Sequence, residues 1–244
     1  MNVFKLLLMF FILTNPAKSN SIYNIIKIPN LEIYELKSLN NLKYFYAEKP
    51  FRVGVQKNIS CMNSNKKTYE EKYKIISKNL NRYSKEFLKK INLKYIVMCE
   101  NLIISGIKTA GIPDHKMKTL IIDVKFNSKF FERVIHHEVF HIINDGFKNI
   151  FDEKKWSSLN EIDFKYTSCS TCSDKTGLYV YKEYNGFFTE YSKSTASEDM
   201  AEVFSHIVFS KDIVTKKTSN DLILKKKVDF IKDKINIIDN NFNF

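Results

Sequence analysis

The pentapeptide His137-Glu138-Val139-Phe140-His141 has the HExxH spacing and lies in a segment, 128–144, whose apolar residues repeat at helical spacing. Residues four apart lie one above the other on a helix, so both imidazoles can reach one metal ion. Glu138 projects beside them, where a carboxylate can act as a general base without being a ligand. The pattern predicts one Zn²⁺ site with His137 and His141 as ligands. His136 falls about 100° away on the helix and is not predicted to bind the ion.

A catalytic zinc ion usually has three protein ligands, so a third must come from elsewhere in the chain. The extended form HExxHxxGxxH is excluded, because Asn144 and Phe147 stand where it requires glycine and histidine. The other common form takes a glutamate from a separate downstream helix. The segment Glu198-Asp199-Met200-Ala201-Glu202 offers two glutamates, four residues apart on one face.

These glutamates also have a purely structural interpretation. Thr195-Ala196-Ser197-Glu198 has the pattern of a capping box, in which Glu198 would only satisfy a backbone donor at the start of a helix. Glu202 could then be a solvated surface charge. The HExxH motif favours the metal-ligand interpretation, because the site otherwise lacks a third ligand.

A family resemblance follows from HExxH, from Tyr191 seven residues before Glu198, and from the glutamate-bearing segment 198–202. This pattern resembles gluzincins of the anthrax-lethal-factor type and a group of bacterial zinc-binding metallopeptidases. The stretch 186–191, Gly-Phe-Phe-Thr-Glu-Tyr, is similar to the second group, and the likeness covers roughly residues 127–210. Phe140 stands where the lethal-factor form has a small residue, and a long partner-binding region is missing, so a toxin function does not carry over.

The resemblance implies a role for each site residue. It implies Glu138 as general base, Tyr191 as donor to the oxyanion, Glu202 as a partner that orients a ligand histidine, and a ligand set of His137, His141 and Glu198. A hydrogen bond to the developing oxyanion is worth about 3 kcal/mol in comparable sites. The expected function is an exported zinc metallopeptidase that acts on peptide or protein substrates. The alternatives are a catalytically inactive zincin scaffold that acts as a binding protein, against which the intact Glu138 argues, and a zinc hydrolase of non-peptide amides.

The expected fold is α+β and zincin-like, with a small twisted sheet, an active-site helix and a mostly helical lower lobe. Hydrophobic patterns predict strands at 25–28, 42–46, 51–55, 93–98 and 120–124, and amphipathic helices at 69–91, 196–209 and 222–238. The HExxH helix is expected to begin at Asn127 or Ser128 and to end at Gly146 in a left-handed conformation. Residues 147–190 are expected to be irregular, with a hairpin near Tyr179–Tyr181 and Asn185-Gly186. Trp156 could line the cleft, although core packing is the commoner place for tryptophan.

The composition and the N-terminal segment indicate the number of domains and the localisation of the protein. The 244 residues, with 44% hydrophobic content, suffice for one domain over 20–244, whose part 20–60 is rich in strands. Residues 1–19 have the pattern of a signal peptide, with Lys5, a short apolar run and Ala17-Lys18-Ser19 at the cleavage site. We therefore expect a secreted or periplasmic protein, with no integral membrane segment after removal of the signal.

The net charge bears on nucleic-acid binding, and the cysteine content bears on disulfides or a second metal site. The net charge of +12 comes from scattered lysines without interleaved stacking aromatics, so nucleic acid is not an expected partner. The four cysteines are Cys61, Cys99, Cys169 and Cys172. In an oxidising compartment they favour two disulfides, and a structural zinc bound by four thiolates is the alternative.

Overall fold

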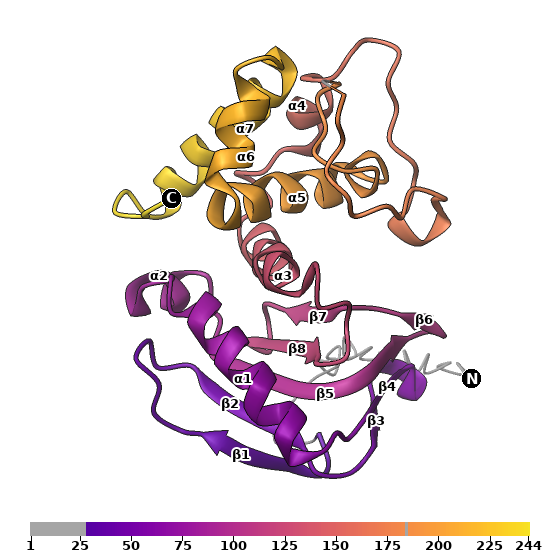
Figure 1. The fold of residues 1–244 in the computed structure, drawn as a ribbon, viewed down its shortest axis with the longest axis vertical. Coiled ribbons are helices and arrows are strands. Elements are labelled where there is room, and N and C mark those ends of the chain that lie inside the picture. Colours follow the sequence, from indigo (N-terminus) through magenta and orange to yellow (C-terminus); the bar gives the residue numbers. More distant parts are fainter. Residues whose placement is uncertain (1–27, 184) are drawn as a thin grey trace, which may run out of the picture.

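A computed structural model of the chain describes residues 28–183 and 185–244, so the expected signal segment and most of the run 25–28 lie outside the described residues. Figure 1 shows two lobes with helix α3 (Phe131–Gly146) between them. The sheet lobe contains the strands and the helices α1 and α2, and the helical lobe contains α4 to α7. The α+β, zincin-like fold expected from the sequence is confirmed.

The long central strand β5 (Tyr95–Ile104) joins two groups of strands. Its first half pairs in parallel with two strands, which are flanked by antiparallel edge strands, and its second half pairs only with antiparallel neighbours. The other strands are β1 (Leu31–Glu35), β2 (Lys43–Ala47), β3 (Phe51–Val53), β4 (Ile59–Met62), β6 (Ile107–Lys108), β7 (Gly111–Asp114) and β8 (Thr119–Asp123). The first group has the order β1-β2-β5-β8-β7, so β7 forms the edge that contacts α3.

The single helix expected over 69–91 is wrong, because the chain forms α1 (Lys66–Leu80) and α2 (Lys85–Lys90) instead. The Ser84 hydroxyl accepts a hydrogen bond from the backbone N–H of Phe87 at 3.0 Å and starts the second helix as its N-cap. The apolar stripe nevertheless continues across the break. Tyr69, Ile76 and Leu80 on α1, Tyr83 between the helices and Phe87 on α2 are all buried.

The ends of α3 differ from the expectation. The helix begins at Phe131, and the Asn127 side chain accepts from the N–H of Lys129 at 3.0 Å in the preceding turn, so neither Asn127 nor Ser128 is the N-cap. Gly146 is the last residue of the helix, and its φ is not positive. A Cβ at Gly146 would lie 2.6 Å from Nε2 of His115, so glycine permits a close approach here and not a left-handed turn.

In the helical lobe the predicted helices α5 (Ala196–Phe209) and α7 (Leu222–Ile238) occur with the expected bounds. Two further helices, α4 (Glu153–Ser157) and α6 (Lys211–Thr218), were not predicted. The hairpin occurs around a bridge between Val180 and Thr189, and Gly186 has a φ of 82°. Single-turn 3-10 helices lie at Val55–Lys57 (η2), Ser170–Cys172 (η3) and Tyr191–Lys193 (η4).

Two clusters of buried apolar residues stabilise this arrangement. The larger extends from the sheet through α3 into the helical lobe, so α3 is buried on nearly all sides. The smaller lies on the opposite face of the sheet and contains the disulfide between Cys61 and Cys99. Trp156 is fully buried and donates to Asp199 at 2.9 Å, so it packs in the core and does not line the cleft.

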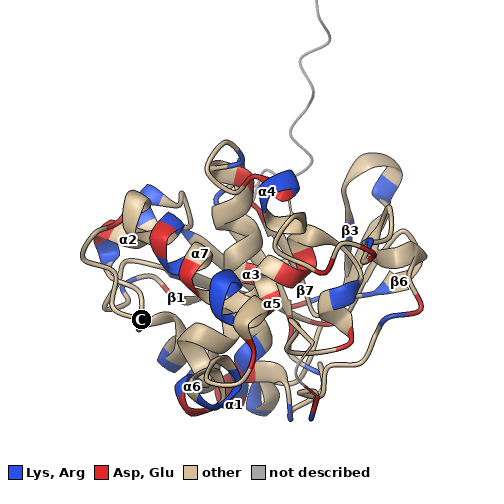
Figure 2. Cartoon of the chain, turned by 90° about the horizontal axis from the view of Figure 1, so that it is seen from above, with Lys and Arg blue, Asp and Glu red and all other residues tan. Residues whose placement is uncertain are grey.

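In the view from above, charged residues of one sign do not gather in a single patch. In Figure 2, Lys and Arg alternate with Asp and Glu along α7, and both signs recur around the rim of the molecule. Among residues 28–183 and 185–244, none of the helices has the length and apolar character needed to cross a bilayer.

Candidate metal centre

Helices α3 and α5 pack against each other and bring three side chains together. Nε2 of His137 lies 2.9 Å from Oε2 of Glu198, and Nε2 of His141 lies 3.2 Å from the same oxygen. The two Nε2 atoms are 3.1 Å apart. HExxH supplies two atoms of this triangle and the first turn of α5 supplies the third. Within the described part of the chain, this is the one group of three side chains arranged to hold a metal ion.

The orientation of the rings tests whether a cation suits the site. Nδ1 of His137 lies 3.0 Å from Oε1 of Glu202, and Nδ1 of His141 lies 3.4 Å from the Ser197 hydroxyl. A neutral imidazole that donates from Nδ1 has a lone pair on Nε2. In this protonation state, lone pairs from both rings and from Glu198 converge, an arrangement that is stabilised by a positive charge between them, either a proton on His137 or a metal ion. A tetrahedral zinc with bonds of about 2.0–2.1 Å separates its ligand atoms by about 3.3 Å, so the donor set fits this ion.

The electrostatics of the site also favour a cation. Burial alone would lower the pKa of His137, but hydrogen bonds with Glu198 and Glu202 outweigh it and raise the pKa to about 10. Burial would raise the pKa of Glu198, but the adjacent His141 and His137 lower it well below its ordinary value. The two carboxylates thus remain ionised and stabilise positive charge at the centre of the triangle.

The capping role expected for the Glu198 carboxylate does not occur, although Thr195 is the N-cap of the helix. The backbone N–H of Glu198 donates to the Thr195 hydroxyl at 3.2 Å, so Thr195 caps the helix as the sequence suggests. Its carboxylate turns away from the cap towards the histidines. Glu202, one turn later, is fully buried, so its interpretation as a solvated surface charge is wrong.

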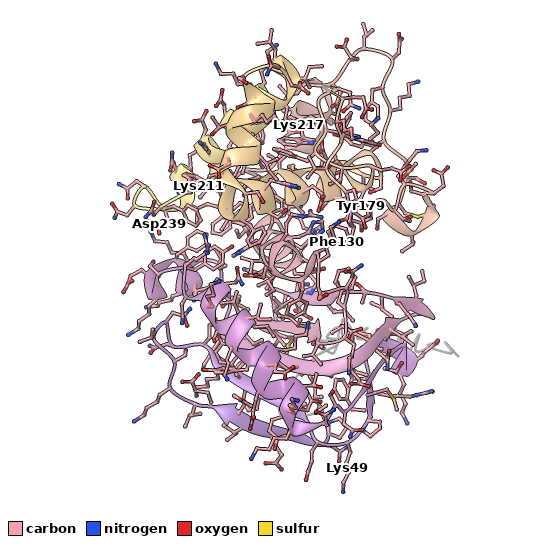
Figure 3. All side chains as sticks on the ribbon, in the orientation of Figure 1. Lys49, Phe130, Tyr179, Lys211, Lys217 and Asp239 are labelled. Atoms are coloured by element: carbon pink, nitrogen blue, oxygen red, sulfur yellow. A yellow bond between two sulfur atoms is a disulfide. The ribbon has the colours of Figure 1, made fainter. Side chains whose placement is uncertain are left out.

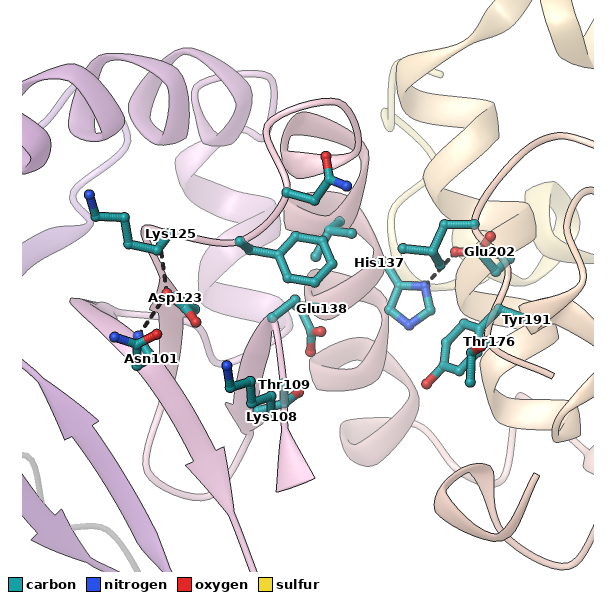
Figure 4. A pocket seen from close by; sticks show the side chains of 15 residues that line it. Asn101, Lys108, Thr109, Asp123, Lys125, His137, Glu138, Thr176, Tyr191 and Glu202 are labelled. Carbon is teal, nitrogen blue, oxygen red and sulfur yellow. Dashed lines mark hydrogen bonds and ion pairs between the residues drawn. The ribbon is translucent and has the colours of Figure 1, made fainter. Parts of the chain in front are cut away.

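Glu138 lies beside the triangle and faces the cleft. Figure 4 shows its carboxyl group between the edge of the sheet and the ring of His137. Burial raises its pKa, while His137 and His141 act in the opposite direction. Glu138 lies close to Gly111 on the edge strand β7. If residue 111 had a side chain, its Cβ would lie 2.7 Å from Cγ of Glu138. A glycine at this position therefore makes room for the carboxylate.

Tyr191 occupies the other side of the cleft, at the start of η4. Its ring centroid lies 5.9 Å from that of His137, and its hydroxyl points into the pocket that Glu138 also faces (Figure 4). Burial raises the pKa of Tyr191, and the nearby carboxylates of Glu198 and Glu138 raise it further. The phenol consequently keeps its proton at neutral pH and can act as a hydrogen-bond donor.

The cleft extends to both sides of these residues. On one side, a hollow of about 480 Å³ is lined by Phe126, Val134 and Leu178, and by the sheet edge at Lys108 and Thr109. On the other side the walls come from the sheet edge and from the segment 170–173. Both hollows share His137, Glu138 and Tyr191, so an extended ligand lying in the cleft would pass directly over them.

Sequence reasoning missed the residues that surround Glu202. Oε1 of Glu202 accepts from Nη1 of Arg133 at 2.5 Å, and Oε2 accepts from the Thr189 hydroxyl at 2.7 Å. The signal for Arg133 was present, since it precedes His137 by one helical turn. Thr189 gave no such signal, because it reaches Glu202 only through the fold of the hairpin.

The other histidines lie away from the triangle. His136 bonds Tyr83 at 2.6 Å and Asn79 at 3.1 Å on a different face of α3 from His137, and burial lowers its pKa to about 3. His206 stacks on Phe188 with ring centroids 4.2 Å apart. His136 thus ties α1 to α3 as a neutral residue, and neither ring faces the cleft.

All four cysteines are paired in the structure. Cys61 bonds Cys99 within the smaller core, and Cys169 bonds Cys172 on the surface segment that forms one wall of the cleft. The cysteines are therefore arranged as two disulfides and not as one four-thiolate metal site.

A comparison with known proteins adds a family match. A model of the family described as "Putative zinc-binding metallo-peptidase" matches residues 56–243. This range contains the three triangle residues together with Glu138, Tyr191 and Glu202. No curated protein matches the chain.

Proposed function

Because the chain belongs to the zinc-binding metallopeptidase family whose model covers residues 56–243, we propose that it hydrolyses peptide bonds as a zinc peptidase of the gluzincin type. The convergence of His137, His141 and Glu198 on one point, with contacts of 2.9–3.2 Å, is the observation that carries this proposal. A bound zinc ion would supply Lewis acidity, lowering the pKa of a water to about 7 and polarising a substrate carbonyl.

Glu138 is proposed to move the proton. Its carboxylate is next to the triangle but outside it, so it can accept a proton from the attacking water and pass it to the leaving amine. The upward shift in its pKa, caused by burial, brings its basicity closer to that of a base active near neutral pH. An inactive scaffold would have no need for a carboxylate in this position, which favours an enzyme over a binding protein.

Tyr191 is proposed to stabilise the oxyanion, since its protonated phenol points into the same pocket from the opposite wall. Glu202 is proposed to orient His137 through the hydrogen bond to Nδ1, which keeps Nε2 available for the ion. Peptide bonds are favoured over small non-peptide amides because the cleft continues on both sides of the site, as a polypeptide requires.

We further propose that the chain works as one exported domain over residues 20–244. The signal-like pattern of residues 1–19 supports export. The pairing of all four cysteines into disulfides is a second supporting observation, because such bonds persist in oxidising compartments.

Metal analysis combined with one substitution tests the proposed mechanism. The purified protein should contain one zinc per chain and cleave members of a peptide library until a chelator is added. Glu138→Gln should keep the zinc and lose at least ~10³-fold in turnover. Glu132→Gln is the matched control, because Glu132 lies on the same helix but contacts Asn79 and Lys78 away from the cleft. Equal turnover for Glu138→Gln and the wild type would refute the assigned base.

A further inference from the structure

Arginine is rare in this chain, and one arginine is buried. Of the 39 basic residues, 36 are lysines and only Arg52, Arg82 and Arg133 are arginines. Arg52 and Arg82 are exposed, whereas Arg133 is 5% exposed. Although nearly all basic residues of this chain are lysines, the buried position 133 is occupied by an arginine.

The Arg133 guanidinium makes two contacts that lead to different parts of the site. Nη1 lies 2.5 Å from Oε1 of Glu202, the same oxygen that faces Nδ1 of His137. Nη2 donates to the backbone oxygen of Leu178 at 3.2 Å, and the Leu178 side chain lines the cleft. One group therefore connects the carboxylate behind the His137 ring with a wall of the cleft.

The contacts require the planar, forked shape of a guanidinium. Two nitrogens of one rigid group point at two fixed acceptors, and the compact ammonium of lysine cannot reproduce this geometry. The cleft wall is also held against the start of α3 by Tyr179, whose ring packs edge-on against Phe130 with centroids 5.0 Å apart (Figure 3). Arg133 adds the buried, polar part of the same attachment.

We propose that Arg133 is a positioning residue for the metal centre. It holds the Glu202 carboxylate so that the His137 ring presents Nε2 to the ion, and it fixes the cleft wall at Leu178. Arg133 is too deeply buried to touch a substrate, so its effect is transmitted through these two neighbours. This inference rests on the proposed zinc site and deepens it.

Zinc affinity measured by competition with a chromogenic chelator tests the first half of the inference. Arg133→Met should raise the zinc Kd by about 10–100-fold, the range found when partners of ligand histidines are removed. Arg133→Lys should lie between this variant and the wild type, because it restores the charge but not the fork. Arg82→Met is the matched control and should bind zinc as the wild type does, since Arg82 donates to the backbone oxygen of Val208, away from the three residues of the triangle. Melting curves of the zinc-free proteins identify which variants are folded, and Arg133→Lys keeps the test open if Arg133→Met does not fold.

A double-mutant cycle with Glu202→Gln distinguishes positioning from general structural support. If Arg133 acts through Glu202, Arg133→Met should change the zinc Kd less than ~3-fold in the Glu202→Gln background. The visible spectrum of the cobalt-substituted protein should change in the Arg133→Met variant and return towards that of the wild type in Arg133→Lys. Full additivity of the two Kd effects, or a wild-type Kd for Arg133→Met, would overturn the inference. A wild-type chain that binds no zinc would instead refute the proposed function itself.

Discussion

Gly111 provides a test of the proposed general base, Glu138, that leaves Glu138 itself unchanged. An alanine Cβ at this position would lie 2.7 Å from Cγ and 2.9 Å from Cδ of Glu138, and 3.2 Å from the backbone oxygen of Ile121. The first two distances are shorter than any ordinary carbon–carbon contact, and the backbone oxygen limits how far the new methyl can retreat. The Glu138 side chain must therefore move away from β7 in the Gly111→Ala variant.

The expected result follows from the size of this displacement. To restore a normal contact of about 3.5–4.0 Å, Cγ of Glu138 has to shift by about 1 Å. A misplacement of this size in a catalytic group costs roughly 10²-fold in rate. Zinc content should stay at the wild-type level, because the atoms nearest to the added methyl belong to Glu138 and Ile121 and not to His137, His141 or Glu198. Stability should fall by no more than about 1–3 kcal/mol, the usual cost of overpacking.

The assay compares kcat/KM, zinc content and Tm for the wild type, Gly111→Ala and a control. Gly146→Ala is a suitable control, because its Cβ would also meet a side chain, Nε2 of His115 at 2.6 Å, but away from the cleft. It should leave kcat/KM of the folded, zinc-loaded protein unchanged. If Gly111→Ala cleaves peptides as fast as the wild type, the position of Glu138 against β7 is irrelevant to catalysis and the reasoning fails.

Three further predictions concern the ligand, the oxyanion donor and the disulfides. Glu198→Ala should abolish tight zinc binding in a metal titration, whereas Thr195→Ala should keep the zinc and cost about 1 kcal/mol of unfolding free energy as a lost cap. Zinc retained by Glu198→Ala would show that this carboxylate is not a ligand. Tyr191→Phe should lower turnover by about 10²–10³-fold at unchanged zinc content, and an unchanged rate would leave Tyr191 with packing alone. Under mild reduction, mass-spectrometric mapping of alkylated thiols should show Cys169 and Cys172 labelled before Cys61 and Cys99. The reason is that Cys61 and Cys99 are fully buried, whereas Cys169 and Cys172 are at least partly exposed. Labelling in the reverse order would contradict this reasoning.

The elements with strong periodicity were predictable from the sequence, and the positions that depend on tertiary contacts were not. The α5 and α7 helices occur with the expected bounds because each combines an N-cap, Thr195 or Asp221, with a regular apolar stripe. The break between α1 and α2 was missed because Tyr83 and Phe87 continue the stripe across it, so the hydrophobic pattern contains no sign of Ser84 starting a new helix. The left-handed conformation expected at Gly146 is wrong because this glycine allows a close approach of His115 instead. His115 is distant in the sequence, so the local pattern around Gly146 contains no sign of this contact.

The site shows the same division between local and tertiary information. Spacing within each helix predicted that His137 and His141 share a face and that Glu198 and Glu202 share another, and the structure brings these two faces together. Gly111, Arg133 and Thr189 were missed, because their importance follows from which element packs against which. The spacing of Arg133, one turn before His137, places it on the same face of the helix, but its contact with Glu202 is known only from the packing of α3 against α5. The position of Gly111 on an edge strand gives no such signal.

At the interface between α3 and α5, polar side chains from the two helices form a connected series of contacts. Arg133, His137 and His141 follow one another at intervals of four on α3, and they face Glu202 and Glu198, also four apart, on α5. Every one of these groups is largely removed from water, so each needs a partner of opposite charge or a hydrogen bond. Arg133 and His137 both contact Oε1 of Glu202, and the remaining polar atoms of His137, His141 and Glu198 converge on one point, as the ligands of a bound cation would. The same contacts that join the helical lobe to α3 therefore also bring together the three groups that could hold a metal ion, so the proposed site depends on the packing of HExxH on one helix against a glutamate on another.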